Sequence, residues 1–419
     1  MKLLDELRAG AFDAMLCTLY GAADHARAAH VIEAFAERFP EHVDQALLFS
    51  APGRTEIGGN HTDHQHGCVL CGSVDLDMLA CAAPNGLQEL RVWSEGYGGV
   101  AVALTDLAPK PEERDTTAAL VRGVAAGVAA LGHAVGGADI YVHSNVLAGS
   151  GLSSSAAFEV LIGTILNRFF CGGALDSITI AKISQMAERD YYGKPCGLMD
   201  QMGSAVGGAV AIDFQDPANP VVERSDYDFT KSGHALCIID TGSSHDDLTA
   251  DYAAIAEEMR SVARCVGKDV LRDVPEELFR AELVSVREQC GDRAVLRALH
   301  FYSDNRRARQ EAEALQEGDF DRFLALVNAS GLSSVCDLQN IWSPSHPARQ
   351  AVSLTLSLGR ELLGGRGAIR VHGGGFAGTV QAFVPEDVLA PFRSGMEAVL
   401  GAGKCHVLRI RPLGGCEIR

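Results

Sequence analysis

The sequence contains no run of eighteen consecutive apolar residues, so it predicts no membrane-spanning helix. Its first sixteen residues mix charged with apolar positions and lack the uninterrupted apolar core of a signal peptide, which indicates an amphipathic helix instead. Positive charge is also scarce, since 36 Lys and Arg stand against 54 Asp and Glu and leave a net charge of −18. Nucleic-acid binding needs clustered Lys and Arg. We therefore expect a cytoplasmic protein that binds neither membranes nor nucleic acids.

Several familiar motifs are missing as well. No GxxxxGK[ST] occurs, which excludes a Walker-type nucleotide loop, and no GxGxxG lies in an early βαβ unit. The twelve cysteines include one CxxC, formed by Cys68 and Cys71, but no second pair follows. Structural zinc needs four ligands. We therefore expect free thiols in a reducing compartment rather than a zinc site.

The pattern of apolar residues predicts a mixture of helices and strands without regular βαβ alternation, which is typical of an α+β fold. The loop at 215–220, with two prolines and other turn formers, is the best candidate boundary, and it divides the chain into domains 1–214 and 215–419. Helices are predicted at 1–40, 116–131, 153–170, 178–192, most of 246–331, 346–360 and 386–400. Strands are predicted at 46–52, within 68–104, and at 138–146, 207–214, 234–242, 368–373, 378–384 and 405–411.

A turn rich in glycine and serine, residues 149–155, follows a predicted strand and opens a predicted helix. Glycine lets the backbone approach an anion closely. The first N–H groups of a helix have no internal partner, and they lie in a field that favours negative charge. Phosphate binding is therefore favoured over the alternative of a helix start capped by serine. The residues concerned are Gly149, Ser150, Gly151, Leu152, Ser153, Ser154 and Ser155.

A dense polar loop, residues 52–64, follows the apolar strand that is predicted to end at Pro52. Such a cluster is costly to bury unless each group is paired. A polyhydroxylated ligand would pair it, because Asp and Asn form hydrogen bonds with hydroxyls. A solvent-exposed loop is the alternative, and the irregular spacing of its histidines makes a metal site the lesser option. A further glycine-rich stretch, residues 371–379, lies between two predicted strands and indicates either a tight hairpin or a wall near a nucleotide.

Four segments, in this order, resemble the motifs of the GHMP kinases and, among them, of the galactokinases. Residues 53–64 resemble the galactokinase signature GRxNxxGEHxDY, residues 147–156 the phosphate loop PxxGxGLSSSA, and residues 373–378 the GGGFGG motif. Residues 193–201, GKPCGLMDQ, are similar to the galactokinase segment that contains the catalytic Asp. The resemblance extends from about residue 48 to the end of the chain. Four ordered motifs at the family's spacing are far more specific than any one of them.

The resemblance implies a two-domain fold, with an N-terminal ribosomal protein S5-like α+β domain, a C-terminal ferredoxin-like domain and the active site between them. It makes Asp200 the catalytic carboxylate and Arg54 its partner, the alternative for Asp200 being a helix cap. It implies ATP binding by the turn at 149–155. It also implies sugar contacts and Mg²⁺ ligands: Asn60, His61, Asp63, Gly197 and Tyr252 for the sugar, and Ser154 and Glu188 for the ion.

The chain departs from the family pattern at several positions. Asn60 stands where galactokinases have Glu, and Glu56 stands where they have Asn. His64 replaces a Tyr, and Leu147 replaces the proline of the phosphate loop. Asn60 can still form a hydrogen bond with a hydroxyl, but without the strength of a charged acceptor. The identity of the sugar is therefore the part of the prediction that these departures affect.

The implied activity is ATP- and Mg²⁺-dependent phosphorylation of the anomeric C1 hydroxyl of a monosaccharide, with galactose 1-phosphate as the expected product (EC 2.7.1.6). Alternatives are another sugar such as N-acetylgalactosamine or arabinose, a non-catalytic sugar sensor, and a mevalonate- or homoserine-type kinase. The serines at 153–155 and Asp200 are present, which favours an enzyme over a sensor. The segments 61–63 and 195–200 argue against the mevalonate and homoserine types. A monomer is favoured, with the sugar and ATP as its partners.

Overall fold

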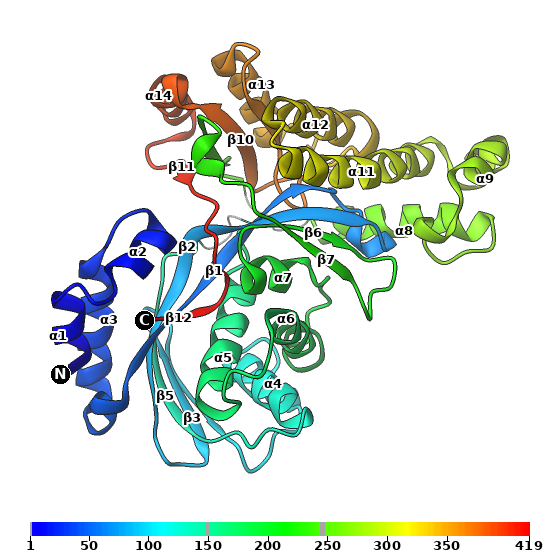
Figure 1. The fold of residues 1–419 in the computed structure, drawn as a ribbon. Coiled ribbons are helices and arrows are strands. Elements are labelled where there is room, and N and C mark those ends of the chain that lie inside the picture. Colours follow the sequence, from blue (N-terminus) through cyan, green and yellow to red (C-terminus); the bar gives the residue numbers. More distant parts are fainter. Residues whose placement is uncertain (1, 148–150, 244–247) are drawn as a thin grey trace.

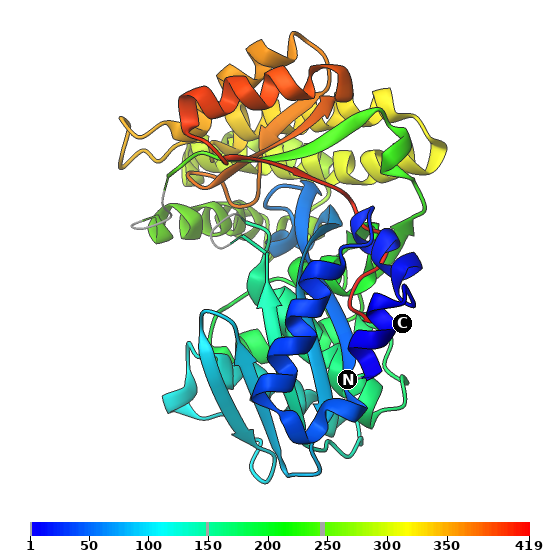
Figure 2. The ribbon, with the colours of Figure 1, turned by 90° about the vertical axis from the view of Figure 1, so that its left-hand side faces the viewer.

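The computed structural model describes residues 2–147, 151–243 and 248–419. Their strands form two sheets, which lie in the two lobes seen in Figures 1 and 2. The first sheet has the order β12-β1-β2-β5-β3-β4, with β6 paired to β2 and β7 paired to β6, and the second has the order β11-β8-β10-β9. The mixture of helices and sheets confirms the predicted α+β class. No helix in these three ranges is both long and apolar enough to cross a membrane.

The elements have the following bounds. The first sheet contains β1 Leu47–Gly58, β2 Cys68–Pro84, β3 Glu89–Ser94, β4 Gly98–Ala103, β5 Ala138–Ser144, β6 Ala209–Asp213, β7 Val221–Ser225 and β12 Cys416–Ile418. The second contains β8 His234–Asp240, β9 Ala368–Val371, β10 Thr379–Pro385 and β11 Cys405–Leu408. The helices are α1 Lys2–Arg8, α2 Asp13–Tyr20, α3 His25–Arg38, α4 Thr117–Ala130, α5 Ser154–Phe170, α6 Ser177–Met186, α7 Met199–Val206, α8 Thr249–Cys265, α9 Glu276–Ala281, α10 Leu283–Cys290, α11 Asp292–Glu317, α12 Phe320–Ser333, α13 Ala351–Leu363 and α14 Leu389–Leu400.

Helices cover both faces of the first sheet because its central strands are apolar on both sides. Successive side chains of a strand point to opposite faces. Leu48 and Leu79 accordingly pack with α1–α3, whereas Phe49 and Ala80 pack into the core formed with α4–α7. Figure 1 shows the two helical layers on opposite sides of β1, β2 and β5. The N-terminal helices therefore form part of the fold of the first lobe.

The N-terminal segment is helical as predicted, but it forms three helices instead of one. Gly10 and Gly21 have positive φ angles of 80° and 76°. Gly21 ends α2 in the left-handed conformation, with its N–H donating to the carbonyl of Cys17. Such a residue stops a helix and reverses the chain. The breaks let α1 and α3 pack against each other.

The first strand continues six residues beyond its predicted end at Pro52. Proline cannot donate to a ladder, and the register with β2 shifts between Pro52 and Arg54 and again between Glu56 and Gly58. Pairing resumes after each shift, so β1 extends to Gly58. The polar segment that was predicted to be a loop is therefore partly strand, and the residues of that strand part are buried.

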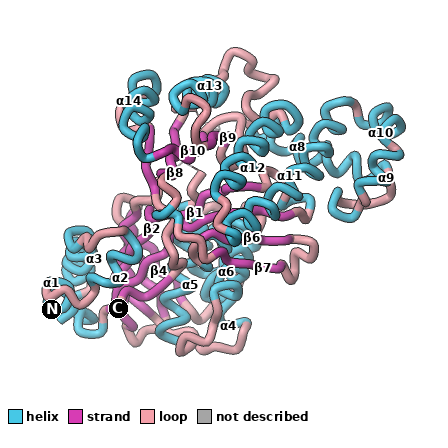
Figure 3. Tube along the Cα trace, turned by 45° about the horizontal axis from the view of Figure 1, so that its top comes forward, coloured by secondary structure: helices cyan, strands magenta, loops and turns pink. Residues whose placement is uncertain are grey.

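The second sheet confirms the ferredoxin-like prediction. Its strands β8, β9, β10 and β11 occur in the order 4-1-3-2 and are all antiparallel, with α14 between β10 and β11. Helices α13 and α14 pack on one face of the sheet, and α12 contacts β9. Helices α8–α10 extend from this lobe (Figure 3).

The two sheets do not divide at the loop 215–220. Beyond this loop, β7 pairs with β6, and β12 pairs with β1 at the edge of the first sheet. The last residues of the chain therefore return to the first lobe. The division into domains 1–214 and 215–419 stays a prediction. The strands β7 and β12 follow residue 214 in the sequence, but they belong to the first sheet.

Candidate active site

Arg54 on β1 and Asp200 in the first turn of α7 form an ion pair, although 146 residues separate them. Nε and Nη2 of Arg54 donate to Oδ1 of Asp200 at 2.8 and 2.6 Å. Nη1 of Arg54 donates to the carbonyl oxygen of Gly151. The structure therefore places the two predicted catalytic residues in contact with each other and beside the glycine- and serine-rich turn.

The surroundings of Asp200 keep its carboxyl group ionised. Burial by itself would raise the pKa of Asp200, but the charge and hydrogen bonds of Arg54 and a hydrogen bond from Ser153 outweigh it, so the pKa lies below its ordinary value. An ionised carboxylate only accepts hydrogen bonds. Asp200 is therefore an acceptor at neutral pH, aimed at the turn that precedes α5.

The described part of the predicted phosphate-binding turn packs closely on β1. Arg54 N–H donates to the carbonyl of Leu152 at 2.9 Å. A Cβ atom at Gly53 would lie 2.9 Å from that same oxygen, so β1 needs glycine there. Gly151 and Ser153 have φ angles of 71° and 57°, and α5 begins at Ser154. The predicted residues Gly149 and Ser150 lie outside the described residues.

Glu188 lies next to this helix start, in a short π-helical segment, Ala187–Tyr192, that ends the predicted helix 178–192. Its carboxylate accepts hydrogen bonds from Ser155 Oγ at 2.9 Å, Lys194 Nζ at 3.0 Å and Gln201 Nε2 at 2.7 Å. Ser154 was the predicted partner of Glu188 at a Mg²⁺ site. Among the hydrogen bonds of the described residues, Ser155 makes this contact, because it follows Ser154 by about 100° around α5.

A cavity of about 280 Å³ opens beside Ser154 and Ser155. Its wall combines apolar and aromatic side chains with polar ones. The apolar and aromatic residues are Met78, Tyr97, Leu120, Val142, Val146, Phe158 and Tyr192, and the polar ones are Ser94, Glu95, Asp115, Thr117, Ser144, Ser154 and Ser155. The start of α5 therefore lies at the edge of a pocket with a mixed apolar and polar wall.

A second cavity, of about 470 Å³, lies at the other predicted motif. We call it the polar cavity because charged and histidine side chains contribute to its wall. It is lined by Arg54, Glu56, His61, Asp63, His64, Pro195, Cys196, Gly197, Met199, Arg260, Gly373 and Gly374. Arg54 thus joins the wall of this cavity to the ion pair with Asp200. The residues come from β1, the loop after it, the loop before α7, the first residue of α7, helix α8 and the glycine-rich stretch between β9 and β10.

Three of the predicted sugar-contacting residues line the polar cavity. His61 has a φ of 58°, and its Nε2 donates to the carbonyl of Gly374 at 2.9 Å, which leaves Nδ1 as an acceptor. Burial lowers the pKa of His61 to about 4, so the ring is neutral at pH 7. Burial raises the pKa of Asp63. A Cβ at Gly197 would lie 2.6 Å from Oδ2 of Asp63, so glycine leaves room for this carboxylate.

Asn60, in contrast, does not line the cavity. Its Nδ2 donates to Glu56 Oε1 at 2.9 Å and to the carbonyl of Gly373 at 2.7 Å. Its Oδ1 accepts from Ser334 at 3.2 Å and from Asn340 at 2.8 Å. The residue is 0% exposed and its amide has no hydrogen-bonding capacity left. Protein groups therefore occupy its whole side chain in this structure, and the sugar contact of Asn60 stays a prediction.

Tyr252 also lies behind the wall of the cavity. Its hydroxyl donates to the carbonyl of Gly375 at 2.7 Å, and its ring packs edge-on against Phe376. A Cβ at Gly374 would lie 2.7 Å from its Cε1, so the ring supports that glycine from the rear. In this structure Tyr252 therefore supports the cavity wall, and its predicted contact with the sugar stays a prediction.

Glu56, His64 and Arg260 line the polar cavity but were not predicted as site residues. Glu56 was noted as a departure from the galactokinase signature, and the sequence signal was the exchange of Asn for Glu inside that motif. Arg260 lies on α8, eight residues after Tyr252 and about 80° from it around the helix axis. No sequence pattern therefore singled it out.

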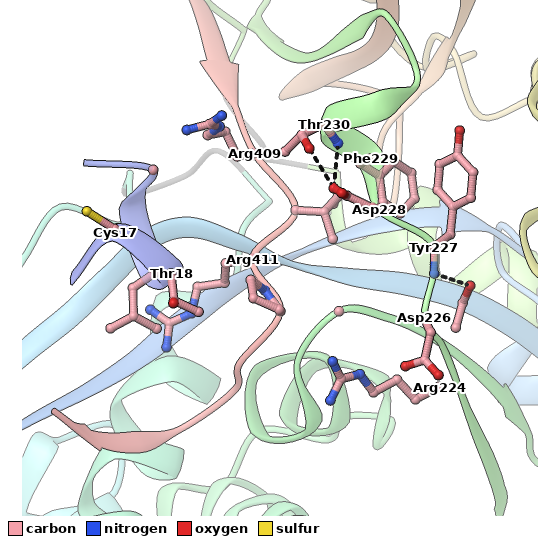
Figure 4. A pocket seen from close by; sticks show the side chains of 16 residues that line it. Cys17, Thr18, Arg224, Asp226, Tyr227, Asp228, Phe229, Thr230, Arg409 and Arg411 are labelled. Carbon is pink, nitrogen blue, oxygen red and sulfur yellow. Dashed lines mark hydrogen bonds between the residues drawn. The ribbon is translucent and has the colours of Figure 1, made fainter. Parts of the chain in front are cut away.

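A further cavity, of about 440 Å³, lies between α2, the segment 224–230 and the segment 409–412 (Figure 4). It contains none of the predicted site residues. Of its three arginines, Arg411 donates to Asp77, Ser50 and two carbonyl oxygens, and Arg409 lies against Gly21 at the end of α2. Figure 4 shows that the guanidinium groups of Arg224 and Arg409 do not converge. Arg409 and Arg411 therefore pack against the protein itself, and the arginines of this cavity do not surround a common binding point.

Two family models match the chain over the segments that build this geometry. Residues 119–208 match the GHMP kinases N terminal domain, and residues 33–84 match the galactokinase galactose-binding signature. The first match contains the turn before α5, Glu188 and Asp200. The second contains Arg54 and the loop with His61 and Asp63.

Solved structures share the fold over nearly the whole chain. A galactokinase from Lactococcus lactis, crystallised with galactose, has a TM-score of 0.77 at 22% identity, covering 93% of this chain and all of its own. A D-glycero-D-manno-heptose 1-phosphate kinase from Bacteroides thetaiotaomicron has a TM-score of 0.59 at 13% identity, covering 89% and 99%. A phosphomevalonate kinase from Streptococcus pneumoniae, in complex with phosphomevalonate and AMPPNP, has 0.59 at 13%, covering 86% and 99%.

Proposed function

The chain is a galactokinase-like protein of the GHMP kinase superfamily, and on that premise we propose that it transfers the γ-phosphoryl group of ATP to the anomeric C1 hydroxyl of a monosaccharide. Galactose is the first candidate. The observation that carries the proposal is the Arg54–Asp200 ion pair, which joins the wall of the polar cavity to Ser153 and Gly151 in the turn before α5. A hydroxyl in the polar cavity and a phosphate at this turn would both meet Asp200.

Phosphoryl transfer depends mainly on positioning and on neutralising charge. In the proposed reaction, ionised Asp200 accepts a hydrogen bond from the C1 hydroxyl and takes its proton as the bond from O1 to the γ-phosphorus forms. The bond from that phosphorus to the bridging oxygen breaks, and ADP leaves with the electron pair. Arg54 orients the carboxylate and adds positive charge where the transition state is negative. Asp63 and neutral His61 offer acceptors to the remaining sugar hydroxyls.

The residues near Glu188 fit a metal ion whose ligands come partly from the protein and partly from the phosphates of ATP. Mg²⁺ prefers oxygen ligands and is usually held by one or two carboxylates together with substrate phosphates. The described residues contain no group of three or more His, Cys, Asp or Glu that could hold a metal unaided. Glu188 and the neighbouring hydroxyls of Ser154 and Ser155 supply the expected oxygens. When bound with ATP, Mg²⁺ would neutralise phosphate charge.

The cavity of about 280 Å³ supports the nucleotide part of the proposal. Besides Ser154 and Ser155, its wall contains apolar side chains that can pack against an adenine ring, together with polar ones that include Glu95 and Asp115. In this arrangement the start of α5 holds the phosphates, whose charge its free N–H groups and dipole favour. Lys194, paired with Glu188, is a further cation at that end.

An ADP-release assay over a panel of monosaccharides tests the proposal, with the position of the phosphate determined on the best substrate. We expect ADP release with galactose and phosphate on O1. Faster turnover of N-acetylgalactosamine or arabinose than of galactose would support the proposed sugar 1-kinase activity but would replace galactose as its substrate. Sugar binding without ADP release from any member of the panel would contradict the enzyme and favour a sensor.

Gly197→Val should selectively weaken sugar binding. The added side chain starts 2.6 Å from Oδ2 of Asp63, so either the carboxylate or the backbone must move. Overpacking of this kind costs roughly 1–3 kcal/mol, which corresponds to an increase of about 5- to 150-fold in KM for the sugar. The KM for ATP in the same variant is the internal control, and a parallel rise in both constants would show general damage instead.

A further inference from the structure

The carboxylate of Glu56 is fixed by charge from behind the polar cavity. Its Oε1 accepts a hydrogen bond from Nη2 of Arg370 at 2.7 Å. Arg370, on β9, is 0% exposed, and its other nitrogens donate to the carbonyls of Val371 and Ile57. A buried guanidinium with these partners cannot move without breaking several hydrogen bonds. The position of the carboxylate is therefore set by the second lobe.

The second partner of Glu56 is Asn60, which donates to the same oxygen, Oε1, at 2.9 Å. The hydrogen bonds that the described residues make to this carboxylate all fall on Oε1. Because Glu56 lines the polar cavity, Oε2 is the oxygen that remains for a ligand. His61 and Asp63 line the same cavity.

Asn60 has the properties of a support. Besides the four hydrogen bonds of its amide, its N–H donates to Asp304 Oδ2 at 2.9 Å, and its carbonyl accepts from His300 Nε2 at 2.8 Å. All its polar atoms are therefore used by the protein, and most of these partners belong to the second lobe. The signature has kept one carboxylate and one amide at positions 56 and 60 but has exchanged their places.

We propose that Glu56 is the specificity-determining residue of the polar cavity, where its Oε2 accepts a hydrogen bond from a sugar hydroxyl other than the one that is phosphorylated, while Asn60 holds Glu56 in position. This inference rests on the proposed function. A carboxylate accepts hydrogen bonds but donates none. The group that meets Oε2 must therefore be a donor such as a free hydroxyl, and an acetamide carbonyl or a second carboxylate at that place would be rejected.

The test combines substrate analogues with a variant. The ratio kcat/KM is measured for the best sugar and for each of its monodeoxy analogues, with the wild-type protein and with Glu56→Gln. In the wild type, we expect one analogue to lose about 10- to 100-fold through the missing hydrogen bond to a charged group. In Glu56→Gln, that loss should shrink to a few-fold, while the losses of the other analogues stay as they are. An unchanged profile of losses would overturn the proposal.

Three further variants control for a folding defect, since Glu56→Gln leaves Arg370 with a neutral partner. The double variant Glu56→Asn/Asn60→Glu keeps one carboxylate and one amide in contact, whereas the single variant Asn60→Glu places two carboxylates together. We therefore expect a higher melting temperature for the double variant than for Asn60→Glu. The sugar hydroxyl whose removal lowers kcat/KM the most, which we call the most sensitive position, should differ between the double variant and the wild type. Ser334→Ala, which removes a hydrogen bond to Asn60 outside the cavity, should preserve the wild-type profile.

The outcomes separate the two hypotheses. If the wild type phosphorylates a sugar but the double variant has the same most sensitive position, Glu56 does not read the substrate and the inference fails by itself. If Ser334→Ala changes the profile as strongly as Glu56→Gln, the effect is one of support, and the inference fails as well. If no sugar leads to ADP release with the wild type, the proposed function is overturned together with the inference built on it.

Discussion

Asp200→Asn should lower turnover by about 10²–10⁴-fold, the range that proton transfer by a positioned side chain contributes, and should leave the binding of ATP and sugar nearly intact. Asparagine has almost the same shape and can still accept a hydrogen bond from Arg54 through its oxygen. It has no negative charge and cannot take a proton from the sugar. The effect should therefore appear in kcat, measured by ADP release, with dissociation constants measured by calorimetry.

The control for this experiment is Asp190→Asn. Asp190 is a surface residue paired with its neighbour Arg189, so the same chemical change there should leave kcat within the error of the assay. Melting temperatures of both variants are needed because Arg54 is 8% exposed and loses a charged partner in Asp200→Asn. Near-normal turnover of a folded Asp200→Asn protein would contradict the proposed role of this carboxylate.

Asp77→Asn should be among the most destabilising single changes in the first lobe, by about 3–5 kcal/mol, the cost of breaking a buried ion pair. Asp77 is 0% exposed and accepts hydrogen bonds from Arg27 on α3, Arg411 in the C-terminal segment, Tyr20 at the end of α2 and Ser50 on β1. An amide in its place turns an NH₂ group toward these donors. The free energy of unfolding in urea is the measurement.

Asp75→Asn is the matched control on the same strand. The side chain of Asp75 accepts a hydrogen bond from the backbone N–H of Arg409, which an asparagine oxygen can also accept. Its effect on the free energy of unfolding should be much smaller. Equal losses in the two variants would show that Asp77 contributes no more than any half-buried carboxylate on β2.

The Asp77 site also gives a direction for the pH dependence of stability. Burial by itself would raise the pKa of Asp77, but Arg27 and Arg411 outweigh it and hold the pKa below its ordinary value. The contribution of a lowered pKa is fully present above the unfolded-state value of about 3.9 and is lost as pH falls through the folded-state value. Asp77→Asn should remove this part of the acid sensitivity.

Much of the fold and part of the site could be predicted because their signals are local. The helix at 153–170 was predicted within one residue, and β2, β3 and β4 fall within the stretch 68–104 where strands were predicted, since periodicity and turn residues mark these segments. The pairing of Arg54 with Asp200 came from the family's motifs, because no periodicity links residues 146 apart. The resemblance therefore supplied the long-range contact, and the local pattern supplied the elements that hold it.

The structure departs from the sequence predictions where tertiary contacts decide. Asn60 and Tyr252 have side chains suited to a sugar, but partners largely from the second lobe occupy Asn60, and Tyr252 packs against the backbone of Gly374 and Gly375. Pro52 was expected to end a strand, yet β2 continues the ladder past it on one side. Such outcomes depend on which distant residues arrive at a position, and a single sequence does not specify them locally.

Because β12 pairs with β1, the first sheet can be completed only late in the synthesis of this protein. Leu48, Phe49 and Ser50 pair with residues 416–418, which the ribosome adds after every other strand of the first sheet. Until then, this edge of β1 exposes unpaired backbone groups, and an open edge is where chains associate wrongly. Chaperone binding to nascent chains should therefore persist until the last strand has emerged, and chains stalled before residue 416 should aggregate.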